Sequence, residues 1–481
     1  MREYTTQICV IAAGPAGLAA AAQAAEDGAK VIVLEKMKRA GGTANAGMGI
    51  LGIGTHYQKA QMYDISVEKS FKMYMEYTHY NVDARLIRRY FEQSSETIEW
   101  LEDMGVEFEG AFKYFPQSEP TWHIVKCPRG IGAGAAQTMN QKIYEHCVEL
   151  GVEFLFETAA KKLIKEDGHI TGVIGETKAG EEFTVHCQAA VLAAGGASGD
   201  FDMVYEETGF TPKKDMFNFV TKSCSGDGLR MAWEAGADHV PVRIEQAAAI
   251  EGISGLPNAV MNIFFQPNLL VNLHGKRFVN EEDMQNTTYL SNAVAHQKHK
   301  MGIMIVDTSI VEHYIENGVD VISFVRPDPD VSAFPAAVEK AKKVGTKGLY
   351  IADTIKELAE QLGIDPQALS ETVEEYNDFC DGTDEEFYKS PKYMRKLEKG
   401  PFYAARVRPG GYGTVGGIRI NENCEACDRE FLPVPGLYAA GADACNIYDD
   451  SYMFLLPGNS MGFALNTGRI AGMSAAELVS E

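Results

Sequence analysis

The feature that most constrains the fold is a pattern of strand, turn, helix and strand that ends at Glu35. A buried strand is predicted over residues 8–12, a helix over residues 15–27 and a second strand over residues 30–34. Two strands joined by a helix run parallel in one sheet, so we expect an α/β layer. The turn has Gly14 and Gly17 at the spacing of the G-x-G-x-x-G pattern, with Ala12 at the first position. The pattern predicts a Rossmann-type, dinucleotide-binding unit.

The residue types in this turn suit a bound dinucleotide. Gly14 lets a pyrophosphate approach the backbone, and Gly17 allows the helix to pack closely against the strand. The helix begins at Pro15 and Ala16, where free N–H groups and the helix dipole favour phosphate. Glu35 ends the second strand, where its carboxylate accepts the hydroxyls of an adenosine ribose. The alternative interpretation is a purely structural turn, and the missing first glycine is its best support.

A second glycine-rich loop follows this strand within a few residues. It contains Gly41, Gly42, Thr43 and Gly47 and continues to Met48. Such a run suits backbone that lies close to a ligand, and a nicotinamide dinucleotide fold would continue into its next helix here. The loop therefore favours FAD over NAD, because it can pass both the pyrophosphate and the flavin ring. The alternative is a flexible surface loop.

The rest of the chain predicts a split domain. A helix is expected over residues 133–151, and strands are expected over 153–156, 161–165, 170–176 and 190–194. The sequence pattern then changes to short strands and amphipathic helices. A glycine-rich pattern of alternating strands and helices returns near residue 413. We expect residues 1–242 and 413–481 to form a Rossmann-type FAD-binding domain like that of glutathione reductase. Residues 243–412 then form an inserted α+β capping domain.

Charge and cysteine usage exclude several classes of partner. The formal net charge of −23 repels nucleic acid and anionic lipid. No apolar run approaches the roughly 20 residues of a spanning helix, and residues 1–7 lack the basic region of a signal peptide, so we expect a cytoplasmic protein without membrane insertion. The 9 cysteines lack framework spacing and the 11 histidines lack ligand spacing. Cys424 and Cys427 form a lone CxxC, so we predict no metal site.

Several motifs in order resemble those of the fumarate reductase/succinate dehydrogenase flavoprotein superfamily. The motifs are Glu35-Lys36, Gly41-Gly42-Thr43, Ala193-Ala194-Gly195-Gly196, Ser225-Gly226-Asp227-Gly228, Gly275-Lys276-Arg277-Phe278-Val279-Asn280-Glu281 and Pro435-Gly436-Leu437-Tyr438-Ala439-Ala440-Gly441. The resemblance spans nearly the whole chain. It implies a split FAD domain with a mobile inserted cap, and hydride transfer between flavin N5 and a carbon of a C=C or CH–CH unit.

The resemblance also implies a set of cofactor-binding residues. Asp443 falls where the family places an acidic residue on the flavin ribityl chain, and residues 458–461 fall at the helix N-terminus that faces the flavin pyrimidine. The expected cofactor-binding residues are Gly14, Pro15, Ala16, Gly17, Glu35, Lys36, Gly41, Gly42, Thr43, Gly47, Met48, Ala160, Ala194, Gly195, Asp227, Gly441, Asp443, Gly458, Asn459, Ser460 and Met461. The loop after Gly42 lacks the histidine of covalent members, so we expect non-covalent FAD.

Departures from the family pattern indicate the substrate class. The catalytic arginine of fumarate reductases is replaced by Gln285, and a substrate-contacting histidine is replaced by Tyr412. Leu455 replaces the arginine that binds the substrate carboxylate, and a further histidine becomes Ala247 or a neighbour. Because a dicarboxylate needs charge-assisted donors at both ends, these changes favour a neutral, largely apolar substrate. The pattern is similar to a branch that is 3-ketosteroid dehydrogenase-like or tetrahydrodaidzein reductase-like.

The group that moves the proton is left open among a few residues. Tyr412 is our first candidate because a phenol can donate to a developing enolate or phenolate. Tyr452 is the next, and Gln285 is expected to orient the substrate by hydrogen bonding, since an amide does not deliver protons well. The alternative for either tyrosine is a packing role.

Two rival functions remain beside a reductase. One is a 3-ketosteroid-type dehydrogenase that runs in the oxidative direction, and the other is a flavin electron carrier without chemistry of its own. The intact FAD motifs favour an enzyme, because only the substrate contacts differ. The sequence shows a small-molecule substrate site but no electron donor, and NADH, a ferredoxin-like protein or a second substrate molecule all fit.

Overall fold

The chain divides into two compact units. The computed structural model describes residues 2–218, 222–251, 258–325, 330–344, 348–444 and 447–480. The first unit comprises residues 1–209, 219–245 and 412–481, and the second comprises residues 210–218 and 246–411. The sequence alone suggested one insertion over residues 243–412, whereas the second unit also takes in the short segment 210–218.

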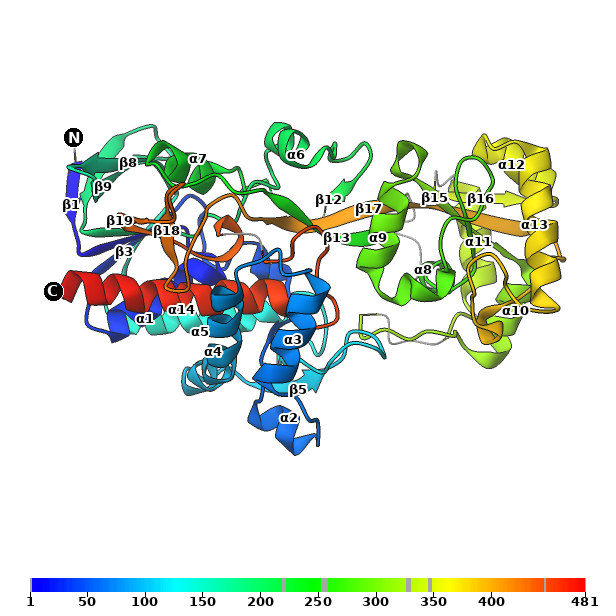
Figure 1. Cartoon of the computed structure of the whole chain (residues 1–481), viewed down its shortest axis with the longest axis horizontal. Coiled ribbons are helices and arrows are strands. Elements are labelled where there is room, and N and C mark those ends of the chain that lie inside the picture. Colours follow the sequence, from blue (N-terminus) through cyan, green and yellow to red (C-terminus); the bar gives the residue numbers. More distant parts are fainter. Residues whose placement is uncertain are drawn as a thin grey trace. The chain divides into compact units, whose positions relative to one another are not determined.

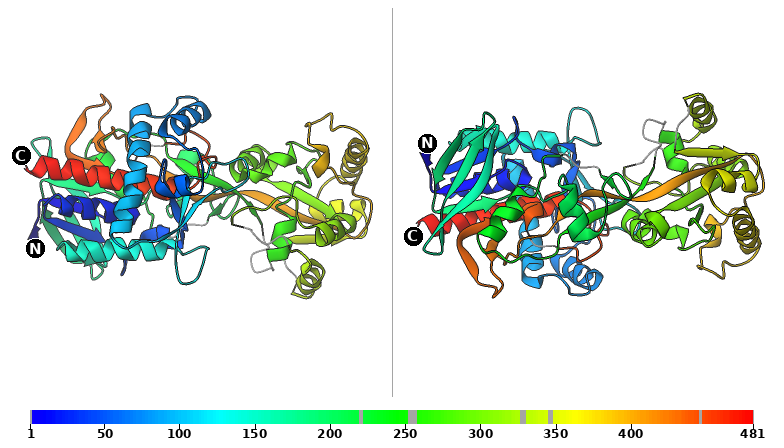
Figure 2. Two further views of the ribbon diagram at one scale, coloured as in Figure 1. Left: turned by 90° about the horizontal axis from the view of Figure 1, so that it is seen from below. Right: turned by 90° about the horizontal axis from the view of Figure 1, so that it is seen from above.

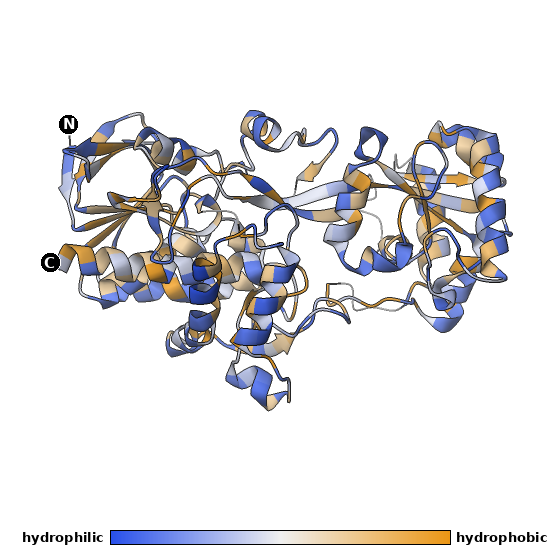
Figure 3. Cartoon of the chain, in the orientation of Figure 1, coloured by the Kyte–Doolittle hydropathy of each residue, from blue (hydrophilic) through white to orange (hydrophobic). Residues whose placement is uncertain are grey.

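A six-stranded sheet forms the centre of the first unit. Its order is β18 (Glu425–Cys427), β19 (Pro433–Ala439), β11 (Ala189–Leu192), β2 (Ile8–Ile11), β3 (Val31–Glu35) and β7 (Glu153–Phe156). The strands pair in parallel except β18, which runs antiparallel to β19 at the edge. β2, β3 and β11 are buried along their whole length. The strands around β3 and β19 are largely orange, the hydrophobic colour, in Figure 3. Strands buried on both faces are typical of α/β sheets, so the predicted fold class is confirmed.

Two helices from opposite ends of the chain pack together on this sheet. α1 (Pro15–Glu26) and α14 (Asn459–Ser480) lie side by side in Figures 1 and 2. Their contact is close because it is made by small residues. A Cβ added at Gly468 would overlap the carbonyl of Ala16, and one at Gly472 would overlap the carbonyl of Ala20. The N-terminal turn of the FAD-type fold is therefore completed by the last helix of the chain.

Smaller elements surround this sheet in the first unit. A four-stranded sheet contains β1 (Arg2–Thr5), β10 (Glu182–His186), β9 (His169–Thr177) and β8 (Thr158–Glu166), and a three-stranded sheet contains β4 (Gly49–Leu51), β6 (Trp122–Val125) and β5 (Phe108–Phe112). The remaining helices are α2 (His56–Ala60), α3 (Val67–Tyr77), α4 (Ala84–Asp103), α5 (Ala136–Glu149), α6 (Phe201–Thr208) and α7 (Asp227–Glu234). The predicted hairpin is realised as β8 and β9.

The second unit is an α+β body with its own core. Its sheet has the order β12 (Phe217–Asn218), β17 (Phe402–Val415), β15 (Gly302–Asp307) and β14 (Leu269–Val271), and β13 (Arg243–Ile250) and β16 (Leu349–Ala352) also pair with β17. Its helices are α8 (Asn258–Ile263), α9 (Thr287–Ala295), α10 (Thr308–Asn317), α11 (Phe334–Val344), α12 (Ile355–Leu362) and α13 (Pro366–Cys380). β15 is buried throughout, and Phe264, Tyr314 and Phe334 fill the core around it.

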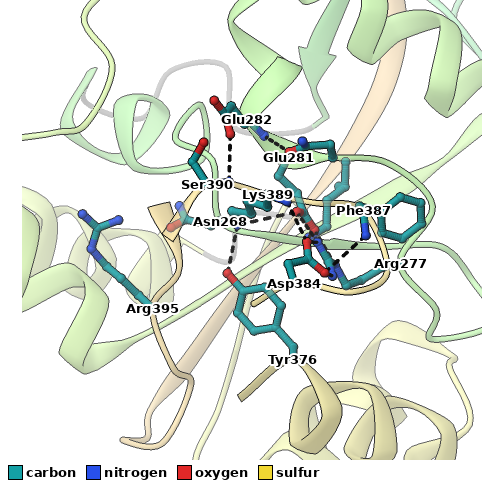
Figure 4. A network of polar contacts seen from close by, with 12 residues as sticks. Asn268, Arg277, Glu281, Glu282, Tyr376, Asp384, Phe387, Lys389, Ser390 and Arg395 are labelled. Atoms are coloured by element: carbon teal, nitrogen blue, oxygen red, sulfur yellow. Dashed lines mark hydrogen bonds and ion pairs between the residues drawn. The ribbon is translucent and has the colours of Figure 1, made fainter. Parts of the chain in front are cut away.

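A buried ion network lies in the second unit (Figure 4). Arg277 donates to both carboxylate oxygens of Glu281 at 3.1 and 2.9 Å and to both of Asp384 at 2.8 Å. Lys389 lies 3.5 Å from Glu281 and donates to the Tyr376 hydroxyl at 2.9 Å. The four charged side chains are almost fully buried. Two cations face two anions among these four side chains, and a third carboxylate, that of the 37% exposed Glu386, lies 3.4 Å from Arg277.

Candidate functional site

The glycine turn after β2 has the shape that a pyrophosphate needs. A Cβ added at Gly14 would meet no atom within 4 Å, so space is open in front of the turn. A Cβ at Gly17 would overlap the carbonyl of Ala12, which shows how closely α1 packs on the strand. The second glycine loop lies directly beside the first. The Gly41 N–H donates to the Ala13 carbonyl at 2.7 Å, and a Cβ at Gly42 would lie 3.3 Å from the Gly14 Cα.

Ala12 explains why the glycine pattern is degenerate. Its φ is +81°, which is the left-handed region where glycine is normally required. The chain therefore keeps the turn geometry of a dinucleotide fold while an alanine occupies the strained position. The departure from G-x-G-x-x-G lies in the side chain and not in the path of the backbone.

Glu35 and Lys36 are placed by the end of β3. The Glu35 carboxylate accepts the backbone N–H groups of Ala13 and Met37, both at 2.7 Å, and burial raises its pKa. Lys36 reaches across to the start of α7, where its ammonium donates to Asp227 at 2.7 Å and to Ser225 at 2.6 Å. Burial works to raise the pKa of Asp227, but the hydrogen bond and charge of Lys36 outweigh it and lower the pKa. Two of the sequence motifs thus meet in one polar cluster.

Asp443 joins two further motifs. Its side chain is fully buried, and its two carboxylate oxygens accept the N–H groups of Ala194 and of Gly196, the latter at 2.7 Å. Gly195 and Gly196 both have positive φ, which points these N–H groups at the carboxylate. Burial raises the pKa of Asp443 to about 6, and the two backbone hydrogen bonds oppose that rise. Gly441 begins the short helix that ends at Asp443, and a Cβ there would lie 3.0 Å from Ala16.

The start of α14 lies against the second glycine loop. A Cβ at Gly47 would lie 2.6 Å from the Met461 sulfur, and one at Gly458 would lie 2.6 Å from the backbone of β4. The Gly458 carbonyl accepts the Leu51 N–H at 2.8 Å, and the Met48 carbonyl accepts the Val125 N–H at 3.0 Å. The first turn of α14, which contains Asn459 and Ser460, is therefore held beside the loop that the sequence assigned to the flavin.

The residues present fit FAD. Open space faces the glycine turn, a buried carboxylate stands at the ribose position, and glycines line every close approach. Thr43 lies in the short helix Gly42–Ala46, and Pro15 and Ala16 open α1. Ala160 is buried in β8, at an irregularity in its pairing with β9. The expected cofactor-binding residues thus all lie in the first unit, where most of them line the two loops and the start of α14.

An aromatic cluster lies in the same unit. Tyr452 is its centre, with ring centroids 4.8 Å from Tyr448, 4.7 Å from Phe454 and 6.4 Å from Tyr412. Tyr114 stacks on Phe454 at 4.7 Å and extends the cluster. Tyr452 is 7% exposed, whereas Tyr412 is 44% exposed and open to a ligand. The structure therefore brings together the two tyrosines that the sequence proposed for catalysis.

A hydrogen bond of Thr414, two residues after Tyr412 on β17, connects this strand to the cofactor motifs. The Thr414 hydroxyl accepts the Ala197 N–H at 2.7 Å. Ala197 directly follows Gly196, which also donates to Asp443. The position of Tyr412 is thus set by the same loop that holds Asp443.

Gln285 lies in the second unit, at the end of a short helix formed by Glu281–Gln285. Its side-chain oxygen is buried and has no hydrogen-bond partner in the part of the chain that the structure describes. The Asn286 amide nitrogen and the Thr287 hydroxyl oxygen, which follow it, are buried in the same way. Unsatisfied buried polar atoms are costly and are explained most simply by a missing partner. These neutral groups suit a ligand that hydrogen-bonds without carrying charge.

Leu455 and Ala247 carry no charge at the positions of the family's arginine and histidine. Leu455 is half-buried, and its carbonyl accepts the Glu119 N–H at 2.8 Å. Ala247 is buried in β13. Neither residue can pair with a carboxylate of a substrate.

Sequence reasoning missed Glu245. It lies on β13 and is 6% exposed. Burial raises its pKa to about 7. A signal was available, because Glu245 and Gln246 are the two polar residues between the apolar Ile244 and the apolar run from Ala247 to Ile250. The pattern alone did not show that this carboxyl is buried.

The described residues contain neither a metal-binding group nor a membrane-spanning helix. Over residues 2–218, 222–251, 258–325, 330–344, 348–444 and 447–480, no group of three or more His, Cys, Asp or Glu is arranged to hold a metal ion. Within the same ranges, no helix combines the length and the apolar character needed to cross a bilayer.

The fold and the cofactor cradle define a flavin-dependent oxidoreductase. A family model described as the FAD binding domain matches residues 7–461. The chain therefore belongs to this FAD-binding family, which includes the flavoproteins of fumarate reductase.

Curated relatives cover almost the whole chain. The vinyl phenol reductase of Lactiplantibacillus plantarum is 32% identical over 98% of this chain and 96% of the relative. The cytochrome-type fumarate reductase of Shewanella frigidimarina is 28% identical over 98% of this chain and 77% of the relative. These relatives, together with the fold, place the chain among FAD-dependent oxidoreductases that act on CH–CH groups.

A solved structure shows the same fold. The 3-ketosteroid-Δ4-(5α)-dehydrogenase of Rhodococcus jostii RHA1, in complex with 4-androstene-3,17-dione, matches with a TM-score of 0.77. It is 24% identical, and the match covers 99% of this chain and 98% of that structure. At this identity the likeness supports the fold alone.

Proposed function

We propose that this protein reduces a C=C bond attached to an aromatic ring or a carbonyl group of a neutral, largely apolar molecule. A vinyl phenol is the first compound to test, because the relative with 32% identity carries that name. Cinnamate-like, isoflavonoid-like and steroid-like alkenes are the next substrate classes.

The aromatic cluster around Tyr452 is the observation that carries the proposal. The rings of Tyr448, Phe454 and Tyr412 have centroids within 6.4 Å of the Tyr452 ring, in edge and tilted arrangements, and Tyr412 is the exposed member of the cluster. Aromatic rings pair favourably with other rings in such geometries. A dicarboxylate would find no compensating cation at Leu455 or Gln285. The cluster is therefore suited to an aromatic substrate and unsuited to fumarate.

FAD, when bound and reduced, supplies a hydride to one carbon of the double bond. The chain has to bind the substrate, exclude water and provide a proton for the other carbon. We assign ring binding to Phe454 and the tyrosines, and hydrogen bonding or proton donation to Tyr412, with Tyr452 as the second phenol of the pair. Gln285 remains our proposal for a residue that orients the substrate by hydrogen bonding.

We further propose that FAD is bound without a covalent bond. No histidine occurs between Gly41 and Gly54. Residues 1–242 and 413–481 are proposed as the FAD-binding domain and residues 243–412 as the capping domain. Acid precipitation separates the two forms of attachment, because a non-covalent flavin stays in the supernatant.

The test is anaerobic reoxidation of the photoreduced protein by a panel of acceptors. The panel contains a vinyl phenol, a cinnamate, an isoflavonoid, an enone steroid, urocanate and fumarate. We expect rapid reoxidation by one of the neutral alkenes, with formation of the saturated product, and no response to fumarate. Fast reoxidation by fumarate would overturn the proposal, and silence across the whole panel would favour a flavin electron carrier.

A second candidate is a ketosteroid-type dehydrogenase, because the uncharged Leu455 and Tyr412 suit a steroid as well as an aromatic alkene. It predicts the opposite direction of turnover. The oxidised protein would be reduced by a saturated 3-ketosteroid, whereas the proposed reductase would not.

A further inference from the structure

A cavity lies between α5 and the segment that leads into the second glycine loop. Its volume is about 170 Å³, and its walls come from residues 38–45, from α5 and from the end of β7. They include Lys38, Arg39, Asn45, Asn140, Tyr144 and Phe156. No residue of these walls belongs to the expected cofactor-binding set or to the aromatic cluster around Tyr452. Neither the FAD assignment nor the proposed substrate therefore uses this cavity.

The charged side chains of the cavity walls are all positive. Lys38 and Arg39 are exposed, and no ion pair joins either of them to another described residue. No carboxylate among the described residues lines the cavity, although the chain has 67 acidic residues and only 44 basic ones. Two unpaired cations around one hollow of an acidic protein create a local field that attracts an anion.

The carboxylates close to these walls have other partners. Glu157 follows the end of β7 and pairs with Lys178 at 2.5 Å. Glu145 of α5 accepts the side-chain amide of Gln141 at 3.1 Å and lies 3.6 Å from Lys142. The two cations of the cavity are thus left for a ligand.

Hydrogen bonds between side-chain amides hold one wall in place. The Asn140 amide donates to Asn45 Oδ1 at 2.9 Å and to the Gly41 carbonyl at 3.4 Å, and the Asn45 amide donates to the Ala40 carbonyl at 3.0 Å. Asn140 is 2% exposed, and its own Oδ1 has no hydrogen-bond partner in the part of the chain that the structure describes. The wall is therefore a fixed part of the fold that keeps one buried acceptor unused.

Two aromatic rings complete the walls. The ring centroids of Tyr144 and Phe156 lie 6.0 Å apart, and the two planes are tilted by 59°. Phe154 packs against both, at 4.9 Å from Tyr144 and 5.7 Å from Phe156. Rings held in this way pair favourably with a further ring. Because a cavity of about 150 Å³ can hold benzene, this cavity is large enough for a single six-membered ring.

We propose that the cavity binds a small aromatic anion, which consists of a single ring that carries a phosphate or a carboxylate group. The ring packs against Tyr144 and Phe156, and the anionic group pairs with Lys38 and Arg39. Because the cavity shares no residue with the aromatic cluster, it is a second ligand site in addition to the one proposed for the alkene.

Fluorine NMR of the FAD-loaded protein tests the proposal. Tyrosines are labelled as meta-fluorotyrosine, and the Tyr144 signal is defined as the one that Tyr144→Phe removes. The probes are phenyl phosphate and benzoate, with phenol as the neutral ring and inorganic phosphate as the anion without a ring. We expect at least one aromatic anion to shift the Tyr144 signal with a dissociation constant of roughly 0.1–1 mM. Phenol and inorganic phosphate should bind several-fold more weakly, and the tighter aromatic anion identifies the anionic group.

Two matched variants separate direct pairing from the general charge of the surface. Arg39→Gln removes a cation of the cavity wall and should weaken binding by about fivefold. Lys142→Gln removes the same charge from α5 at a side chain that does not line the cavity, and it should leave the dissociation constant nearly unchanged. Equal effects of the two variants would overturn direct pairing.

The remaining outcomes decide the nature of the site. A Tyr144 signal that neither aromatic anion shifts would overturn the proposal. Equal affinity for phenol and benzoate would overturn the role of the cations, and equal affinity for inorganic phosphate and phenyl phosphate would overturn the role of the rings. Flavin absorbance is followed in parallel. A shift that appears only as FAD leaves the protein would assign the cavity to the cofactor and overturn a separate site.

Discussion

The two units hold their buried carboxyls in opposite ways. In the second unit, Glu281 and Asp384 face Arg277 and Lys389, and each carboxylate is paired. In the first unit, Glu245 and Asp443 form no ion pair within the described residues, and two backbone N–H groups are the partners of Asp443. A network of paired charges holds its side chains in one arrangement. Removing the charge of one partner would leave the other charge buried and unpaired, which is costly. A buried carboxyl without a cationic partner can change its protonation state or bind a ligand.

The largest expected effect comes from breaking the balanced network. Arg277→Met leaves two carboxylates buried without a bidentate partner, so we expect the free energy of unfolding to fall by about 3–5 kcal/mol. Urea unfolding followed by circular dichroism measures this change. Arg85→Met, at a side chain that is 82% exposed, is the control and should have almost no effect. A loss below about 1 kcal/mol for Arg277→Met would mean that the network is not structurally important.

The second prediction concerns the effect of Glu245 ionisation on the free energy of unfolding. The pKa of Glu245 is about 7 in the folded protein and near 4.3 in the unfolded chain. The folded state therefore binds more protons between these values. Its contribution is complete below about pH 4 and is lost as the pH rises through 7, which amounts to about 4 kcal/mol.

Denaturant unfolding from pH 5 to pH 8 measures that loss. Glu245→Gln should remove the part of the decline that centres on pH 7 and leave the part due to Asp443, whose pKa is raised to about 6. Glu425→Gln should leave the whole decline unchanged. Equal slopes for Glu245→Gln and the wild type would show that Glu245 does not titrate in this range.

A smaller effect is expected at the exposed edge of the aromatic cluster. Tyr412→Phe removes the hydroxyl and keeps the ring, so ring binding should persist while the reduction step slows by roughly 10²-fold. Stopped-flow reoxidation gives the rate, and the flavin absorbance confirms that the cofactor is retained. Turnover close to the wild-type rate would assign Tyr412 to packing.

The smallest effect concerns the glycine turn. Ala12→Gly relieves a left-handed alanine with φ of +81°, so we expect a gain of about 1 kcal/mol in the free energy of unfolding. Thermal unfolding detects it as a small rise in Tm. A destabilised variant would indicate that the Ala12 methyl packs favourably enough to outweigh the strain.

The sequence predicts those parts of the fold that depend on local pattern. Periodicity and glycine spacing indicated β2, α1 and β3 to within a residue or two, because strand, turn and helix each have a signal over short range. The resemblance also placed Tyr412 and Tyr452 among the candidate site residues, and their rings lie in one cluster.

The buried charges could not be predicted in this way. Asp384 lies 107 residues from Arg277, and the turn that carries it looked like an ordinary helix end. Glu245 is a polar residue next to an apolar run, and its burial is seen only when the strand is placed in the fold. Whether a buried charge has an ion-pair partner depends on residues that are distant in the sequence. Local sequence patterns do not show which distant residues come together.

The packing of α14 on α1 sets an order of events during synthesis. The ribosome makes β2, α1 and β3 first, yet β19 and α14, which lie beside β11 and α1, are made last. All strands and helices of the second unit have left the ribosome by then. The nascent chain thus carries an incomplete nucleotide fold, with the alanine-rich face of α1 uncovered, until α14 has been made. The glycine turn at the start of α1 is therefore packed in its final form only after the second unit has been synthesised.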